Sequence, residues 1–488
     1  MGHPRMLIVG HMKQSKISAK GKIMNTRHHR IFFLLIIICV FIAGCSTGVV
    51  EETASTEEAI IVEADADTDL YTQEQEEHRV RFTIEAEADL HKALTALYQA
   101  YFSGELPEFV NSDGDLSVAG IRSENSIHPT FLPGSILIPK KDSQDLIDFI
   151  AFAISPDGQQ VLIDAGELPS VITLTDQAGN SIQIQQPVRR VISAFGPATS
   201  VVYSIDAANR LVAASYTGAG DPKGSAVMSQ IDPRFPDLIS DDFFSRSEFN
   251  IEQAALLEPD LIIASARSAW LEAVDQLGIQ VFLMDAETPE QLREAVLLIG
   301  QLFGPHSSAQ AQNWVAYYNE IIERISAQTD LITKDDRIQV LFTGTEPLRV
   351  ASGDMYQTFI IEAAGGVSVS SGLDGYWNDV NLEQVALWNP DLIVVPSYGG
   401  ASVEAITDNS DWQILAAVQA GRVYQMPRVV VPWDTPAPDS VMGIIWLAGK
   451  INPDLIDLDC EVEVAYFYNT FLNYPISGEE IDTICTID

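Results

Sequence analysis

The chain carries one stretch of sequence twice, as Phe249-Asn-Ile-Glu-Gln-Ala-Ala-Leu-Leu-Glu-Pro-Asp-Leu-Ile-Ile263 and as Val380-Asn-Leu-Glu-Gln-Val-Ala-Leu-Trp-Asn-Pro-Asp-Leu-Ile-Val394. Matching residues are always 131 positions apart, so that Glu252 corresponds to Glu383. Each copy predicts a helix with an Asn N-cap, a Glu in the first turn and a Pro after its end. The Asp-Leu-Ile that follows begins an apolar run typical of a buried strand. A helix–strand unit repeated at this distance indicates two similar α/β lobes.

The length and charge of the chain limit its possible partners. Its 488 residues, of which 47% are hydrophobic, are enough for two or three domains with buried cores. The formal net charge is −40, and the first 44 residues contain seven Lys or Arg and no acid. The rest therefore has 21 basic against 68 acidic residues, a charge of −47. This balance disfavours nucleic acids and anionic membrane surfaces as partners.

The N-terminal region is typical of a secretory leader. A basic segment, Arg27-His-His-Arg30, precedes an apolar run over 31–43 that is too short to span a bilayer. Ile42-Ala-Gly-Cys45 resembles the lipobox of prokaryotic lipoproteins, which implies that Cys45 is lipidated and becomes the mature N-terminus. We therefore interpret 1–44 as a lipoprotein signal peptide, with either Met1 or Met24 as its start. Residues 45–78 are interpreted as an acidic, flexible tether that leaves the membrane surface.

Residues 79–170 are expected to form an accessory segment. Helical spacing of apolar residues over 88–102 and 143–154 predicts two helices. The run that follows, Ser155-Pro-Asp-Gly-Gln-Gln-Val-Leu-Ile-Asp-Ala-Gly166, resembles the end of type II periplasmic binding proteins. The segment is too short for a complete protein of that type, so the resemblance implies a small α/β remnant. A simple helical accessory domain is the alternative.

Several motifs in the remaining chain occur in the order of one known family. A hairpin pattern around Asp176-Gln-Ala-Gly179 is followed by a strand pattern, Pro187-Val-Arg-Arg-Val-Ile-Ser193, and by Asn209-Arg-Leu-Val-Ala213. With the two repeated units, these motifs resemble the class III substrate-binding proteins of ABC importers for iron–siderophores, haem and cobalamin. The resemblance implies an α/β fold of two Rossmann-like lobes joined by a long rigid helix. The lobes are placed at 171–285 and 336–488, with a helical connection at 286–335.

The connecting region supports this organisation independently. From about Ser308 to Thr329 the apolar residues lie on one helical stripe. A helix of about 22 residues is about 33 Å long, which is enough to cross from one lobe to the other. A long core helix within one domain is the alternative.

The chain lacks sequence motifs of common enzymes and metal sites. It has no nucleophile elbow, phosphate-binding loop or zinc-protease motif, so we predict that it is not an enzyme. After Pro169 the only histidine is His306, whereas a site for bare zinc or manganese normally needs several His and carboxylate ligands. We therefore predict no metal site and no cofactor, and a ligand whose metal is already coordinated.

Ligands of open α/β sheets bind at the carboxyl ends of strands, in the crevice between lobes. Aromatic rings there can cover a macrocycle or a catechol, and Arg can pair with an anionic oxygen. Ordinary packing is the alternative for each aromatic residue. We rank Trp433 and Asp434 first because Pro432 and Pro436 make their loop rigid, and direct iron ligation is an alternative role for Tyr398. The candidate ligand-binding residues are Phe195, Pro197, Tyr216, Arg246, Arg267 and Trp270 in the first lobe and Tyr356, Trp377, Tyr398, Trp433 and Asp434 in the second.

Two further sets of residues have expected roles. In the resembled family the Glu that matches Glu252 and Glu383 forms salt bridges with Arg on the two permease subunits, which implies permease docking here; a dipole-stabilised surface residue is the alternative. Cys460 and Cys485 remain after the leader, and outside the cytoplasm a disulfide between them is expected. Two free thiols are the alternative, since spacing does not establish geometry.

The sequence as a whole predicts a monomeric, lipid-anchored, extracytoplasmic binding protein. It would deliver an iron chelate or cobalamin to an ABC permease dimer with its ATPase. An oxyanion such as molybdate is the alternative ligand, for which Arg246, Arg267 and Arg428 would matter more than the aromatic residues. A surface sensor or adhesion module that has lost transport is the alternative from another class, and a hydrolase acting on a cofactor is the remote enzyme option.

Overall fold

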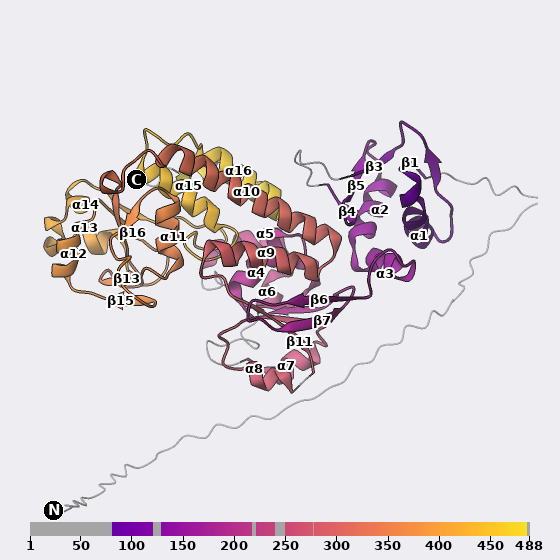
Figure 1. The fold of residues 1–488 in the computed structure, drawn as a ribbon, viewed down its shortest axis with the longest axis horizontal. Coiled ribbons are helices and arrows are strands. Elements are labelled where there is room, and N and C mark those ends of the chain that lie inside the picture. Colours follow the sequence, from indigo (N-terminus) through magenta and orange to yellow (C-terminus); the bar gives the residue numbers. More distant parts are fainter. Residues whose placement is uncertain (1–80, 121–127, 217–220, 240–248, 277, 486–488) are drawn as a thin grey trace, which may run out of the picture. The chain divides into compact units, whose positions relative to one another are not determined.

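The structure is a computed structural model that describes residues 81–120, 128–216, 221–239, 249–276 and 278–485 (Figure 1). All of these residues belong to one compact unit, Glu76–Asp488. The predictions made for the signal peptide, for Cys45, for the tether and for Arg246 lie outside the described residues.

The accessory segment contains a mixed sheet and three helices. Its strands have the order β2-β1-β3-β5-β4, parallel between β1 and its two neighbours and antiparallel from β3 to β4. The rings of Phe82, Tyr98, Phe102 and Phe149 pack together between the sheet and the helices. Both expected helices are confirmed as α1 and α2, and the sheet excludes a purely helical segment. The elements are β1 (Thr83–Glu85), α1 (His91–Tyr101), β2 (Glu108–Val110), β3 (Leu116–Gly120), β4 (Thr130–Leu132), β5 (Ser135–Pro139), α2 (Gln144–Ile154) and α3 (Pro156–Asp164).

The first lobe is a parallel sheet with strand order β11-β10-β8-β9 and helices around it. The predicted hairpin precedes it as β6 and β7, which pair in register from Val171↔Gln185 to Thr175↔Ser181. The elements are β6 (Val171–Thr175), β7 (Ser181–Gln185), β8 (Val191–Ser193), α4 (Gly196–Ser204), β9 (Leu211–Ala214), α5 (Pro222–Ile231), α6 (Phe235–Leu238), α7 (Ile251–Leu256), β10 (Leu261–Ser265), α8 (Leu271–Asp275) and β11 (Gln280–Met284).

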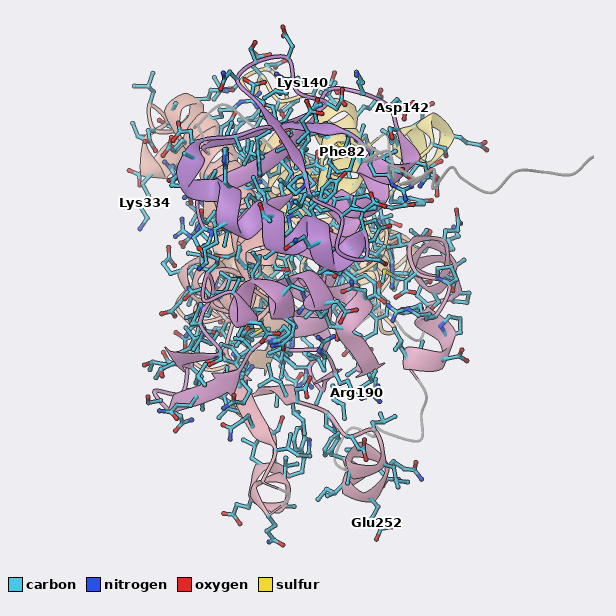
Figure 2. All side chains as sticks on the ribbon, turned by 90° about the vertical axis from the view of Figure 1, so that its right-hand side faces the viewer. Phe82, Lys140, Asp142, Arg190, Glu252 and Lys334 are labelled. Carbon is cyan, nitrogen blue, oxygen red and sulfur yellow. A yellow bond between two sulfur atoms is a disulfide. The ribbon has the colours of Figure 1, made fainter. Side chains whose placement is uncertain are left out.

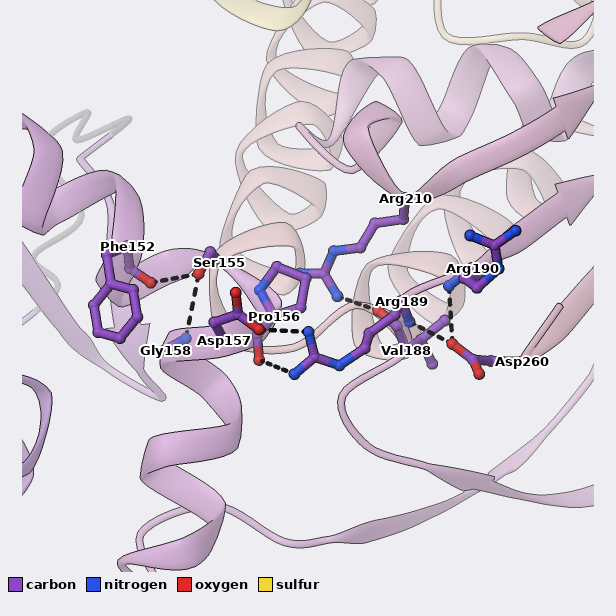
Figure 3. A network of polar contacts seen from close by, with 10 residues as sticks. All are labelled: Phe152, Ser155, Pro156, Asp157, Gly158, Val188, Arg189, Arg190, Arg210 and Asp260. Atoms are coloured by element: carbon purple, nitrogen blue, oxygen red, sulfur yellow. Dashed lines mark hydrogen bonds and ion pairs between the residues drawn. The ribbon is translucent and has the colours of Figure 1, made fainter. Parts of the chain in front are cut away.

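A polar network fastens the accessory segment to the first lobe (Figure 3). The guanidinium of Arg189 lies 2.6 Å from the carboxylate of Asp157, at the start of α3, and donates to the carbonyl of Pro156. The backbone N–H groups of Arg189 and Arg190 both donate to Asp260, at 2.7 and 2.8 Å. The segment that leads into β8 is therefore bonded to the accessory segment through Asp157 and to the first lobe through Asp260.

Two helices connect the lobes, α9 (Pro289–Leu302) and α10 (Pro305–Thr329). With 25 residues, α10 is about 37 Å long and contacts α4 in the first lobe and two helices of the second. Its apolar stripe, including Trp314 and Ile321, is buried in one core that both lobes share. The helix begins earlier than expected, so His306 lies buried in its first turn, where its ring accepts the N–H of Thr130 and pairs with Asp206.

The second lobe repeats the architecture of the first. Its parallel sheet has the order β14-β12-β16-β17, and β13 pairs with β15 in a separate antiparallel ribbon. Cys460 and Cys485 form a disulfide that joins the start of α16 to the end of α17, with 6.0 Å between the Cα atoms. The elements are β12 (Gln339–Phe342), β13 (Arg349–Ala351), α11 (Tyr356–Ala363), β14 (Val367–Ser368), β15 (Trp377–Asp379), α12 (Leu382–Trp388), β16 (Leu392–Val395), α13 (Val403–Thr407), α14 (Ala416–Gln419), β17 (Val423–Gln425), α15 (Ser440–Ile451), α16 (Cys460–Leu472) and α17 (Gly478–Cys485).

The two copies of the repeated sequence have the same local structure. The Asn250 side chain accepts the N–H of Gln253 at 3.1 Å, and the Asn381 side chain accepts the N–H of Gln384 at 2.8 Å. These N-caps begin α7 and α12, and the strands that follow, β10 and β16, lie inside their sheets. The prediction of two equivalent helix–strand units is confirmed.

A buried polar chain crosses the core of the second lobe. The indole N–H of Trp433 donates to the hydroxyl of Tyr468 at 3.0 Å, and this hydroxyl donates to Asp439 at 2.7 Å. Burial raises the pKa of Asp439 to about 7, against the opposing effect of the bond from Tyr468. Between the ordinary pKa of an aspartate and about 7, the folded protein therefore retains a proton that the unfolded chain releases.

This difference predicts the pH dependence of stability. Since the folded state binds more protons in that window, the contribution of Asp439 to stability is present at low pH and is lost as pH rises towards 7. Asp439→Asn, which keeps an acceptor for Tyr468, should therefore have a melting temperature close to that of the wild type at pH 4.5 and a higher one at pH 8. Calorimetry at the two pH values measures this, with the exposed Asp454→Asn as control. An equal shift at both pH values would contradict it.

Candidate functional site

A cavity of about 530 Å³ lies at the carboxyl ends of the second-lobe strands, where Glu287, from the segment between β11 and α9, contributes to its wall. Thr345 follows β12, Tyr398 follows β16 and Arg428 follows β17, so the parallel sheet itself brings these side chains to one edge. The complete lining is Glu287, Thr345, Met355, Tyr356, Gln357, Tyr376, Trp377, Tyr398, Gly399, Arg428, Pro432, Thr435 and Pro436.

Three predicted aromatic residues line this cavity: Tyr356, Trp377 and Tyr398. The Tyr356 hydroxyl shares a 2.8 Å hydrogen bond with Ser440, and burial raises its pKa to about 12. The hydroxyl of Tyr398 donates to Asp434 at 2.7 Å, and burial together with this carboxylate raises its pKa as well. Both phenols are therefore neutral at physiological pH. The Tyr398 hydroxyl is bonded to Asp434 in this structure, and its alternative role as an iron ligand stays a prediction.

Asp434 lies behind the cavity wall. Its side chain is fully buried and accepts hydrogen bonds from the Tyr398 hydroxyl and the Gln357 amide, the latter at 3.2 Å. Burial raises the pKa of Asp434, and these two bonds partly offset that effect. Asp434 therefore orients two residues that line the cavity.

The structure places Trp433 in the core of the second lobe, away from the cavity. Its indole is fully buried and is bonded to Tyr468, as described above. The loop lies directly on α15, since a Cβ atom at Gly443 would come within 2.6 Å of the Trp433 carbonyl. The flanking prolines make this loop rigid, but its contact with α15 turns the tryptophan inward.

Arg428 supplies a positive charge to the cavity. Its Nε lies 3.3 Å from Asp221 of the first lobe, which caps the N-terminus of α5. The Nη2 atom of the same guanidinium is buried and has no hydrogen-bond partner among the described residues. Because a buried N–H without an acceptor is costly, an anionic oxygen in the cavity would be stabilised there.

Arg267 reaches from the first lobe to the second at the edge of the cavity. Its guanidinium donates to the hydroxyl of Tyr376, pairs with Glu287 and lies 5.5 Å from the centre of the Tyr376 ring. Both Tyr376 and Glu287 line the cavity. This predicted ligand residue therefore bridges the two lobes in the structure.

The remaining first-lobe candidates among the described residues lie outside the cavity lining. Phe195 precedes α4 and Pro197 lies in its first turn, both packed with the core. The Tyr216 hydroxyl donates to the carbonyl of Val430, and its ring packs edge-on against a phenylalanine. Trp270 stacks on Phe249 at 4.4 Å between ring centres. The aromatic rings of these candidates pack against apolar neighbours within the fold.

Most of the lining residues were not among the candidates, and Gln357 and Glu287 are two examples. Gln357 follows Tyr356 in the first turn of α11, and Glu287 follows β11. Their positions at a helix start and a strand end are the signals that could have found them.

Among the described residues, no group of three or more His, Cys, Asp or Glu side chains could hold a metal ion. In the same part of the chain, no single helix is long and apolar enough to cross a membrane. The helices α2 and α3, taken together as a bent pair, have sufficient length and apolar composition.

Comparison with known proteins identifies relatives of the two-lobed region. A family model described as periplasmic binding protein matches residues 193–430, just under half of the chain. The molybdate-binding protein MolA of Haemophilus influenzae is 23% identical over 246 residues, which cover 46% of this chain and 69% of MolA. A vitamin B12-binding protein of Photorhabdus laumondii is 25% identical over 224 residues, which cover 45% of this chain and 74% of the relative.

Solved structures show the same fold. A periplasmic solute binding protein from Veillonella parvula has a TM-score of 0.58 at 23% identity, covering 64% of this chain and 96% of its own. MolA bound to molybdate has a TM-score of 0.56 at 19% identity, covering 63% of this chain and 99% of MolA. The two-lobed region therefore has the class III periplasmic binding protein fold.

The bridge made by Arg267 generates a prediction about lobe mobility. Arg267→Ala removes the bond and the cation–π contact to Tyr376, so the segment Asp374–Trp377 should lose protection from amide hydrogen exchange. Exchange followed by mass spectrometry should show at least a several-fold faster rate there. Arg190→Ala is the matched control, because Arg190 is exposed and bonds within the first lobe. Unchanged exchange in Arg267→Ala would show that the bridge does not hold the lobes.

Proposed function

We propose that this chain, whose residues 193–430 match the periplasmic binding protein family and whose two lobes have the class III fold, is the substrate-binding component of an ABC importer. The observation that carries the proposal is the cavity at the strand ends, with aromatic walls and with Arg428, whose Nη2 atom is buried and has no hydrogen-bond partner among the described residues. The ligand is cargo, held by contacts and small movements of the lobes, without chemistry.

The ligand class that fits best is a metal chelate with anionic oxygens, such as a ferric siderophore or haem, or a corrinoid. A volume of about 530 Å³ lies within the usual range for organic ligands. Tyr356, Trp377 and Tyr398 offer rings to a flat or aromatic ligand, and Arg428 offers a charged donor.

An oxyanion is the second candidate. Two observations favour it: the unpartnered Nη2 atom of Arg428, and a molybdate-binding protein among the relatives. A tetrahedral anion would occupy only a small part of the cavity, so the remaining volume favours the chelate.

Delivery requires a partner, for which Glu252 and Glu383 are the proposed docking residues. Both side chains are exposed, and Figure 2 shows Glu252 projecting outward from its helix. They occupy matching positions of α7 and α12, which suits a permease dimer with two equivalent basic sites and its ATPase. The proposal further includes a lipid anchor at Cys45, a location outside the cytoplasm and a monomeric state.

Binding assays distinguish the ligand classes. We expect a ferric catecholate, a ferric hydroxamate, haemin or cyanocobalamin to quench tryptophan fluorescence with a dissociation constant in the micromolar range or below. Trp377→Ala should weaken binding at least about tenfold through lost ring contact, and Arg428→Gln should weaken binding of the anionic ligands most. Trp388→Ala, on α12, is the control. Retention of molybdate alone would favour the oxyanion, and binding of none would favour a sensor or adhesion role.

Charge reversal tests the docking residues. Glu252→Arg with Glu383→Arg should leave ligand affinity unchanged and reduce uptake about tenfold or more, because two ion pairs with the permease become repulsive contacts. Uptake of labelled ligand by cells that carry the transporter measures this. The control is Glu272→Arg with Glu404→Arg, which reverses two other exposed acids. If ligand affinity collapses instead, Glu252 and Glu383 belong to the cavity or the core and the docking assignment is wrong.

A further inference from the structure

Two leucines of the repeated units stand out by their exposure. Leu256 at the end of α7 is 75% exposed, and Leu387 on α12 is 81% exposed. They are 131 residues apart, so they occupy the same position of the repeated unit. A single exposed leucine needs no explanation, but the same exposure at both equivalent positions indicates a shared role.

Each leucine lies beside a proposed docking glutamate. Glu252 and Leu256 are four residues apart on one helix, as are Glu383 and Leu387, so in each pair the side chains are neighbours on the same helix face. The buried residue between them is also equivalent, Ala254 in α7 and Val385 in α12, and it holds the opposite face against the lobe. Each lobe therefore presents one acidic group and one apolar group from the same short helix.

The helices that carry these pairs are fixed to their sheets. In the first lobe Arg190 donates from Nε to the carbonyl of Leu257 at 2.8 Å, and Asp260 accepts the Arg190 backbone N–H (Figure 3). In the second lobe the Asn389 side chain accepts the N–H of Ala416 at 3.2 Å, and Asp391 accepts the N–H of Gln339 at 2.9 Å. Arg189 extends the first-lobe fixation to the accessory segment. Because these helices are held rigidly, less conformational entropy is lost when a partner binds to them.

The chemistry of these pairs specifies the partner. An exposed leucine contributes to binding when it is desolvated in an apolar pocket, and a neighbouring carboxylate contributes orientation and steering. The fitting partner has two equivalent contact sites, each with a basic group about one helical turn from an apolar pocket. A homodimeric permease has this symmetry, whereas a nucleic acid or an anionic lipid surface would be repelled by the glutamates.

We infer that Leu256 and Leu387 are apolar anchors that insert into two equivalent pockets of the permease dimer, next to the basic groups that Glu252 and Glu383 contact. This inference rests on the proposed function and adds to it a contact that does not depend on charge. Salt therefore separates the two contributions, because it screens the glutamate contacts and leaves the burial of leucine intact.

The test measures binding of the full-length protein to its cognate permease–ATPase complex in nanodiscs, by biolayer interferometry at 0.1 and 0.5 M NaCl. Leu256→Ser and Leu387→Ser should each weaken binding about tenfold and together about a hundredfold, with the same ratio to wild type at both salt concentrations. Leu→Met at both positions should restore most of the affinity, since it retains apolar volume. Leu331→Ser is the matched control, because Leu331 is 89% exposed and lies outside the repeated units.

The outcomes separate the inference from the proposed function. If the double serine variant binds as wild type while Glu252→Arg with Glu383→Arg does not bind, the anchor inference is wrong and glutamate docking stands. If neither variant changes binding, the docking surface itself is wrong. If Leu331→Ser weakens binding equally, the effect is not specific to this surface and the inference is overturned. Unchanged melting temperature and ligand affinity in each variant verify that the fold is intact.

Discussion

The burial of one face of α10 in a core that both lobes share is the constraint on which the rest of the structure depends. Trp314, Ile321 and Ile325 lie in the same apolar cluster as first-lobe residues such as Val201 and second-lobe residues such as Ile444. Because separating the lobes would expose this cluster, large hinge rotations are costly. The cavity at the strand ends can therefore change through small movements of the lobes and of the loops and side chains around it.

The duplicated helix–strand unit extends in each lobe from the outer surface to the carboxyl end of the sheet. Its strand lies inside the sheet, and the carboxyl end of β16 leads to Tyr398 in the cavity. Its helix lies before that strand and presents Glu383 and Leu387 to solvent. Since the helix leads directly into the strand, the outer surface and the cavity side belong to one continuous unit. In the first lobe Arg190 bonds to the corresponding unit at Leu257 and Asp260.

Much of the fold could be predicted because it is encoded by local patterns. The Asn N-caps, the apolar runs after Pro259 and Pro390 and the stripe of α10 are all properties of short stretches. The cavity could be predicted only in part. The predicted residues Trp377 and Tyr398 line the cavity, but the orientation of Trp433 depends on contacts with Gly443 and Tyr468, which follow it by 10 and 35 residues. The role of Arg267 likewise depends on a contact with the other lobe, and no local pattern contains it.

The charge distribution suits the two different partners proposed for this acidic chain. In the cavity, the hydroxyls of Tyr356 and Tyr398 are neutral and Arg428 provides a positive group, which suits the proposed ligand with anionic oxygens despite the net charge of −40. On the outer helices, exposed carboxylates beside exposed leucines suit the basic and apolar surface proposed for the permease. Water screens the outer charges from the cavity. If the proposed function holds, the two surfaces can therefore change independently, and substitutions in the cavity can alter the ligand while the fit to the same permease is retained.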